Sequence, residues 1–162
     1  MSDFAALRRR MIEEQLQTRG LDDQRVLDAL MAVPREQFVP DELVEFAYED
    51  TPLPIAAGQT ISQPYIVALM ASSLRLEATD RVLEVGTGSG YAAAVLSRLA
   101  RHVYTIERHE ELAEAAGDVL ARLGFDNADV LHGDGTQGWP EQGRSTRSWW
   151  PPPARRTFRP RS

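Results

Sequence analysis

The chain has 162 residues, of which 43% are hydrophobic, and its formal net charge is −6; this length is enough for one domain with a buried core. Cysteine is absent, which excludes disulfides and thiolate metal sites and is typical of a cytoplasmic protein. The negative charge and the lack of an apolar run of about 20 residues argue against binding to nucleic acid or to a membrane.

The first part of the chain is predicted to be helical. Apolar residues recur at helical spacing, and breakers such as Gly20 and Pro34 separate the segments. We expect these amphipathic helices to cover a sheet or to form a small lid. The predicted helices are residues 3–19, a second helix capped by Asp22 or Asp23, a short segment over 40–46, and residues 65–74.

The segment over residues 47–65 has the composition of an ordered loop. It contains three prolines, one glycine and several small polar residues. A loop of this length without regular structure is uncommon unless it has a function. The alternative is a connector that packs over the edge of the sheet, and the pattern alone does not decide between the two.

A strand, a glycine-rich turn and a helix are predicted over residues 81–100. The apolar run 81–85 indicates a buried parallel strand, and the alanine-rich run 91–100 has strong helix propensity. Glycine in such a turn lets the backbone approach a ligand closely. Three glycines stand between the strand and the helix at alternate positions: Gly86, Gly88 and Gly90.

The spacing of these glycines indicates the kind of ligand. A dinucleotide fingerprint that began at Gly86 would need its third glycine where Tyr91 stands. Glu84, inside the strand, would repel a pyrophosphate but can accept a hydrogen bond from an ammonium group. This favours S-adenosylmethionine, which has a cationic amino acid end and no phosphate. A tight turn without a ligand and a nicotinamide site with altered spacing are the alternatives.

The next two predicted strands are each followed closely by a carboxylate. The strand 102–107 ends in Glu107, and in such folds an acid at this place accepts from both ribose hydroxyls of an adenosine; a solvated carboxylate is the alternative. The strand 128–131 precedes Asp134, which stands between two glycines and could accept from an adenine amino group or be a simple turn residue. The three histidines show no metal-ligand spacing, so we expect no metal.

Four stretches of the sequence together resemble one family. Residues 58–65 read GQTISQPY, residues 48–55 read YEDTPLPI, residues 82–91 read VLEVGTGSGY and residues 33–40 read VPREQFVP. They are similar to protein-L-isoaspartate O-methyltransferases over roughly residues 8–142. The resemblance implies an α/β, Rossmann-like S-adenosylmethionine-dependent methyltransferase fold, doubly wound around a mainly parallel sheet with an N-terminal helical cover. It implies a protein-repair enzyme that methylates the α-carboxylate of L-isoaspartyl residues.

The resemblance also implies the site residues. Ser62 corresponds to the residue usually assigned to the active site, within a substrate-binding run of Thr60, Ile61, Ser62 and Gln63. No general base is needed, because the acceptor is already a carboxylate and the methyl group is already activated, so alignment and exclusion of water are sufficient. The implied partners are isoaspartyl-containing proteins and peptides, bound by a monomer. The implied cofactor-binding residues are Glu84, Gly86, Gly88, Gly90, Glu107 and Asp134.

Residues 143–162 depart from this pattern, with six arginines, four prolines and no acid. We expect no central strand from this composition, so the C-terminal half of the fold would be missing and the edge of the strand 81–85 would favour aggregation. A frameshift is the preferred explanation, because a two-base shift over residues 144–154 can encode an apolar strand. A proline-rich ligand and a basic nucleic-acid tail are the alternatives.

The predicted organisation therefore has three parts. Residues 1–78 carry the helices and the substrate loop, residues 79–142 are the first part of the cofactor-binding domain, and residues 143–162 are a disordered tail. Besides the isoaspartyl enzyme, the open functional alternatives are another methyltransferase and an inactive fragment. Such a fragment would at most bind S-adenosylmethionine, or a partner through its Pro/Arg tail.

Overall fold

The computed structural model of the chain describes residues 3–139 and 147–149. Its centre is a four-stranded sheet of β3 (Arg81–Val85), β4 (His102–Glu107), β5 (Ala128–His132) and β6 (Arg147–Trp149). The order across the sheet is β5-β4-β3-β6, and every neighbouring pair is parallel. The chain thus places β4 and β5 on one side of β3 and β6 on the other, so that β3 borders the point where the strand order reverses.

Helices α4 (Tyr91–Ser97) and α5 (Glu110–Arg122) connect β3 to β4 and β4 to β5. In α5 the buried residues recur at helical spacing, and two glutamates in the first turn complement the helix dipole. The central strand β4 is buried from Val103 to Glu107, as expected for a parallel strand covered on both faces. The predicted strands 81–85 and 102–107 are confirmed at both ends.

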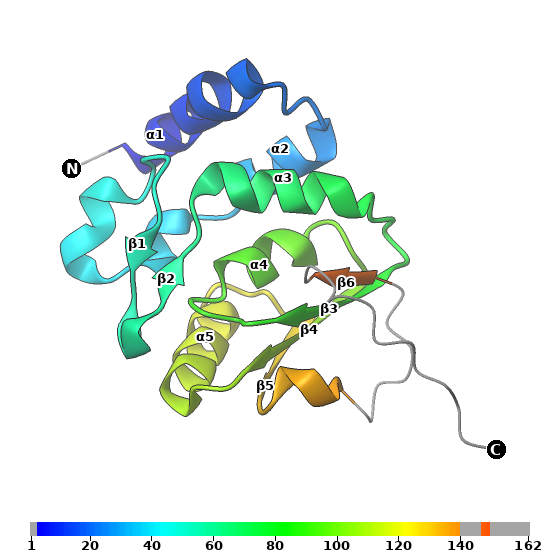
Figure 1. Cartoon of the computed structure of the whole chain (residues 1–162). Coiled ribbons are helices and arrows are strands. Elements are labelled where there is room, and N and C mark those ends of the chain that lie inside the picture. Colours follow the sequence, from blue (N-terminus) through cyan, green and yellow to red (C-terminus); the bar gives the residue numbers. More distant parts are fainter. Residues whose placement is uncertain (1–2, 140–146, 150–162) are drawn as a thin grey trace.

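The N-terminal part forms a helical layer outside the sheet domain, seen in blue above α3 in Figure 1. Helix α1 (Phe4–Arg10) continues as a π-helix to Leu16 and a 3₁₀ turn, which ends where Gly20 adopts a φ of 83°. Helix α2 (Gln24–Ala32) begins at Asp23, whose side chain accepts from the Val26 amide at 3.3 Å. The fully buried Met11, Leu16, Leu30 and Val33 join this layer to one continuous core.

Two 3₁₀ segments, Arg35–Phe38 and Asp41–Phe46, lead to the segment that was expected to be a loop. That segment instead contains a small antiparallel hairpin of β1 (Leu53–Pro54) and β2 (Thr60–Ile61). Helix α3 (Pro64–Leu74) follows directly, with proline at its first position. Leu53 pairs with Ile61 and both are buried, so the hairpin is held by its own apolar contact.

The expectation that the edge of the strand 81–85 stays exposed is wrong over three residues, because Arg147–Trp149 forms an edge strand there. The expectation of no central strand from residues 143–162 is not contradicted by this segment, which lies at the edge of the sheet. This segment pairs in parallel with Val82–Glu84, so the edge of β3 is covered over three residues. The three residues contain no proline, and their amides can therefore complete the ladder. The proposed frameshift and the rest of the tail lie outside the described residues.

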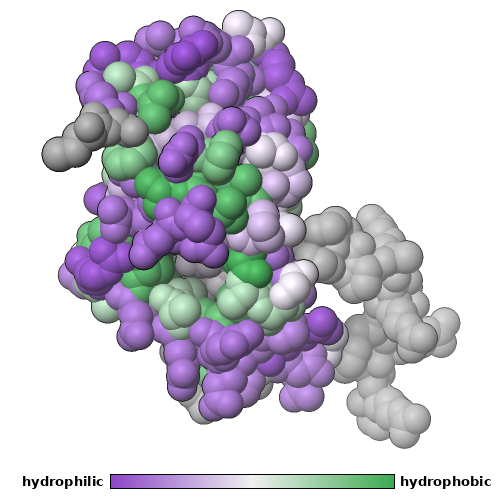
Figure 2. Space-filling model, turned by 90° about the vertical axis from the view of Figure 1, so that its left-hand side faces the viewer, coloured by the Kyte–Doolittle hydropathy of each residue, from purple (hydrophilic) through white to green (hydrophobic). Residues whose placement is uncertain are grey.

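The surface seen in Figure 2 has apolar side chains in its middle, bordered by hydrophilic ones. Phe46, Ile66, Leu69 and Leu131 are the large hydrophobic residues left exposed in the described parts of the chain. None of the described helices is both long and apolar enough to cross a bilayer.

Candidate functional site

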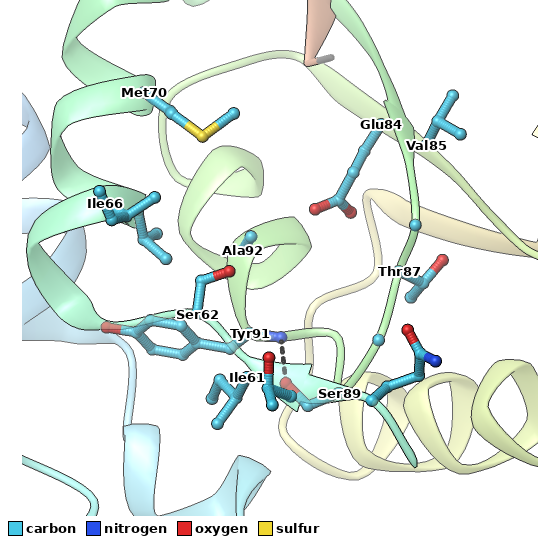
Figure 3. Close-up of a pocket in the computed structure, with 15 residues that line it drawn as sticks. Ile61, Ser62, Ile66, Met70, Glu84, Val85, Thr87, Ser89, Tyr91 and Ala92 are labelled. Carbon is cyan, nitrogen blue, oxygen red and sulfur yellow. Dashed lines mark hydrogen bonds between the residues drawn. The ribbon is translucent and has the colours of Figure 1, made fainter. Parts of the chain in front are cut away.

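A cavity of about 410 Å³ lies between the carboxyl end of β3 and helix α3 (Figure 3). Ligand sites of open parallel sheets occur at this edge, where the strand order reverses. The cavity brings together the two stretches that the sequence analysis considered separately, the glycine-rich turn and the GQTIS segment. Its lining residues are Gln59, Thr60, Ile61, Ser62, Ile66, Val67, Met70, Glu84, Val85, Gly86, Thr87, Gly88, Ser89, Tyr91 and Ala92.

The glycine-rich turn requires glycine at each of its three positions. Gly86, Gly88 and Gly90 have φ values of 92°, 54° and 88°, in the left-handed region that residues with a Cβ rarely adopt. At Gly90 a Cβ would also lie 3.3 Å from the Cβ of Ala116. The turn can therefore pass tightly from β3 into α4, against α5.

Glu84 is a fully buried carboxyl group at the wall of this cavity, with 1% of its surface exposed. The register of β3 and β4 places it opposite Thr105, whose hydroxyl donates to Oε2 at 2.6 Å. Burial raises the pKa of Glu84 to about 8; the Thr105 hydrogen bond opposes this rise and the charge of Glu107 adds to it. In Figure 3 the carboxylate points from β3 toward α3, into the cavity. A cation placed there would stabilise the ionised form.

Glu107, at the end of β4, braces the glycine-rich turn. Its Oε2 accepts from the Gly88 amide at 2.9 Å and its Oε1 from the His109 amide at 3.0 Å. The side chain is buried and does not line the cavity itself. Each carboxylate oxygen can accept further hydrogen bonds, so this role does not exclude contact with a ligand beside Gly88.

Asp134 lies beyond β5 and outside the cavity lining. Its Oδ1 accepts from the Thr136 amide at 2.9 Å and from the Thr136 hydroxyl at 2.7 Å, and these bonds hold the pKa of Asp134 below its usual value. The following Gly135 lies directly against β3, because a Cβ there would meet Val85 Cγ1 at 2.3 Å. The turn therefore lies close to the end of β3 while the Asp134 side chain is exposed.

The GQTIS segment forms the opposite wall, and Thr60, Ile61 and Ser62 line the cavity. Gln63 does not line the cavity. Its Nε2 lies 3.5 Å from both carboxylate oxygens of Asp50. Asp50 also accepts from the Tyr65 amide at 3.2 Å. It therefore holds the junction between Ser62 and α3 in place.

Sequence reasoning assigned no role to Asp50 or to Arg35, which donates to the Ser62 carbonyl at 2.9 Å. Asp50 also forms an ion pair with Arg19 at 2.6 Å, which joins the junction before α3 to the N-terminal layer. Both Asp50 and Arg35 stand inside the stretches that carry the family resemblance, and this is the signal that could have found them. No group of three or more potential metal ligands occurs in residues 3–139.

A parallel sheet, a strand that contains Glu84 and is followed by three glycines, and a cavity at the carboxyl edge define the Rossmann-like fold of S-adenosylmethionine-dependent methyltransferases. Within this class the chain belongs to the protein-L-isoaspartate(D-aspartate) O-methyltransferase (PCMT) family, whose family model matches residues 7–144. The range expected from the sequence, residues 8–142, is confirmed.

Individual relatives agree with this family. The chain is 61% identical to protein-L-isoaspartate O-methyltransferase 2 of Pelobacter propionicus, over 81% of the chain and 58% of that protein. It is 58% identical to the protein-L-isoaspartate O-methyltransferase of Pelotomaculum thermopropionicum, over 85% of the chain and 60% of that protein. The chain thus spans about three fifths of the length of these relatives.

Solved structures give the same result. One named protein-L-isoaspartate O-methyltransferase superimposes with a TM-score of 0.76 at 31% identity, over 87% of this chain and 46% of that one. A Plasmodium falciparum structure, described as a beta-aspartate methyltransferase (PCMT) in complex with S-adenosyl-L-homocysteine, superimposes with a TM-score of 0.70 at 26% identity. That match covers 88% of this chain and 68% of the other.

Proposed function

We propose that the chain transfers a methyl group from S-adenosylmethionine to the α-carboxylate of L-isoaspartyl residues in damaged proteins. The observation that carries the proposal is the single cavity in which the GQTIS segment faces the glycine-rich turn and Glu84. Membership of the PCMT family supports this activity, as do the names of relatives that are 61% and 58% identical to the chain over 81% and 85% of its length.

The residues on the sheet side of the cavity fit the cofactor. Glu84 is buried with a raised pKa, and a cationic amino acid end beside it would offset the cost of ionising a carboxyl group away from water. The cavity volume is in the range of small-molecule sites. S-adenosylmethionine, when bound, supplies an activated methyl group on a sulfonium. We assign its binding to Glu84, Gly86, Gly88 and Gly90, with Glu107 for the ribose and Asp134 for the adenine.

The opposite wall would hold the acceptor. The Ser62 hydroxyl and the backbone amide of Thr60, both from residues that line the cavity, are donors that suit a carboxylate. Since that carboxylate is ionised at neutral pH, no side chain has to remove a proton, and orienting the acceptor while excluding water is the main contribution. In this assignment residues 1–78 supply the acceptor side, residues 79–142 supply the cofactor side, and the tail 143–162 supplies neither.

Further inferences concern the partners and the location. We expect isoaspartyl proteins and peptides to be bound by a monomer in the cytoplasm, without nucleic acid or membrane. The net charge of −6 and the absence of cysteine support this view. Sedimentation of the purified chain, alone and with an isoaspartyl peptide, tests the monomer and shows whether it aggregates.

The test of function is methyl transfer from labelled S-adenosylmethionine to a short isoaspartyl peptide, with the normal aspartyl peptide as control. Base-labile label on the isoaspartyl peptide alone is the expected result. Ser62→Ala should lower kcat/KM by about 10- to 100-fold, whereas Ser73→Ala, at an exposed position of α3, should leave it unchanged. Calorimetric binding of S-adenosylhomocysteine without any methyl transfer would instead support the non-catalytic alternative.

A further inference from the structure

Arg35 is a completely buried arginine behind the substrate segment, with 0% of its surface exposed. It begins the 3₁₀ segment Arg35–Phe38. Its Nε donates to the Ala47 carbonyl at 2.7 Å and its Nη2 to the Ser62 carbonyl at 2.9 Å. One guanidinium therefore holds both Ala47, 12 positions away along the chain, and Ser62, which lines the cavity and is 27 positions away.

The same guanidinium packs against the other side of the site. Its Cζ lies 4.7 Å from the ring centroid of Tyr91, the first residue of α4 after the glycine-rich turn. Tyr91 is 1% exposed and also lines the cavity. Arg35 thus contacts both walls: the segment that carries Ser62, through a hydrogen bond, and the turn that follows β3, through an aromatic ring.

Tyr91, Tyr48 and Asp50 compensate the charge of Arg35 only in part. No carboxylate within residues 3–139 forms an ion pair with it, and burial lowers its pKa. The Nη1 of Arg35 and the hydroxyl of Tyr91 are both buried, and the Tyr91 side chain raises the pKa of Arg35 against the effect of burial. Burying a cation without an ionic partner is costly, so packing alone does not explain an arginine here.

We propose that Arg35 is a positioning residue that sets the placement of Ser62 relative to the glycine-rich turn, and whose buried positive charge favours an anionic acceptor at Ser62. This inference rests on the proposed methyl transfer to a carboxylate. In-line transfer depends on the separation of donor and acceptor, and a displacement of about 1 Å can cost about 100-fold in rate. Only the planar fork of arginine can reach both carbonyls while stacking on Tyr91.

Two substitutions separate geometry from charge. Arg35→Lys keeps the charge and loses the fork, whereas Arg35→Met keeps the approximate length and removes both. Arg25→Lys is the control for losing a fork that bridges two carbonyls: the exposed Arg25 donates to the carbonyls of Leu76 at 2.6 Å and Leu99 at 3.2 Å, away from the cavity.

Both Arg35 variants should bind S-adenosylhomocysteine within about threefold of the unsubstituted chain, since none of its assigned ligands is changed. Arg35→Lys should lower kcat for the isoaspartyl peptide by about 100-fold and raise hydrogen exchange of residues 59–63. Arg35→Met should in addition raise KM for the peptide by about tenfold. Arg25→Lys should change none of these values.

A purely structural role predicts a different pattern. If Arg35→Lys only lowers the urea midpoint, while kcat and KM per folded molecule and the exchange of residues 59–63 match those of Arg25→Lys, the proposal is wrong. It is also wrong if affinity for S-adenosylhomocysteine falls in step with kcat. If the unsubstituted chain binds S-adenosylhomocysteine but methylates no isoaspartyl peptide, the proposed function fails. Hydrogen exchange then still decides whether Arg35 positions Ser62.

Discussion

Replacing Glu84 by glutamine tests whether one buried carboxyl group makes the stability of this protein depend on pH. The pKa of Glu84 is about 8 in the folded chain, against an ordinary value of 4.5. The folded state therefore binds more protons than the unfolded state between these two values, and its free energy of unfolding falls as pH rises through this window. Each pKa unit corresponds to about 1.4 kcal/mol, so the full effect above pH 8 reaches about 5 kcal/mol.

Urea unfolding at intervals from about pH 5 to about pH 8 measures this effect. Glu84→Gln removes the ionisation and keeps the size of the side chain. The free energy of unfolding of the variant, relative to the unsubstituted chain, should therefore rise by about 1.4 kcal/mol per pH unit. Glu114→Gln, which removes an exposed carboxylate from α5, controls for the loss of a charge. The reasoning would be refuted if the free energies of unfolding of Glu84→Gln and the unsubstituted chain differ by the same amount at every pH in this range.

The remaining predictions concern binding and the backbone. Affinity for S-adenosylhomocysteine should rise by up to about tenfold per unit between about pH 6 and pH 8, because a cationic amino group favours ionised Glu84; calorimetry that shows no such slope would exclude this pairing. Gly135→Ala should lower the free energy of unfolding by about 1–3 kcal/mol, since its Cβ would overlap Val85. In contrast, Gly117→Ala should raise the free energy of unfolding by about 1 kcal/mol, because Gly117 lies inside α5 and a Cβ there would meet nothing within 4 Å. If urea unfolding shows the same change for both variants, the packing argument is contradicted. Arg75→Gly should stabilise by about 1 kcal/mol, because Arg75 ends α3 with a φ of 47°, and Arg75→Ala, which keeps the strain, should not.

Features that depend on neighbouring residues were predictable from the sequence. The strands 81–85 and 102–107, a cap at Asp22 or Asp23 and the glycine-rich turn all follow from short-range patterns. The structure has both strands and the turn at those places and the cap at Asp23. Helix ends and left-handed turns are determined within a few residues, because capping bonds and Cβ contacts are local. The family resemblance indicated the fold class and the site residues by analogy, but it gave no distances or contacts between them.

Features that depend on contacts between distant residues were decided by the tertiary structure. The strand Arg147–Trp149 was missed because its composition argued against it, yet an edge strand needs only backbone partners, which β3 provides. Arg35 contacts the Ser62 carbonyl and the Tyr91 ring only after three segments that are separate in the sequence have packed together.

The sequence by itself determined which residues carry polar chemistry: Glu84 inside its strand, Glu107 at the end of the next strand, and Ser62 in its loop. Only the tertiary structure decided what each environment does to that chemistry. Glu84 has its raised pKa because the fold removes it from water, and Glu107 braces Gly88 because β4 ends beside the turn. Burial and long-range contact are properties of the packed chain, and no pattern of neighbouring residues specifies them.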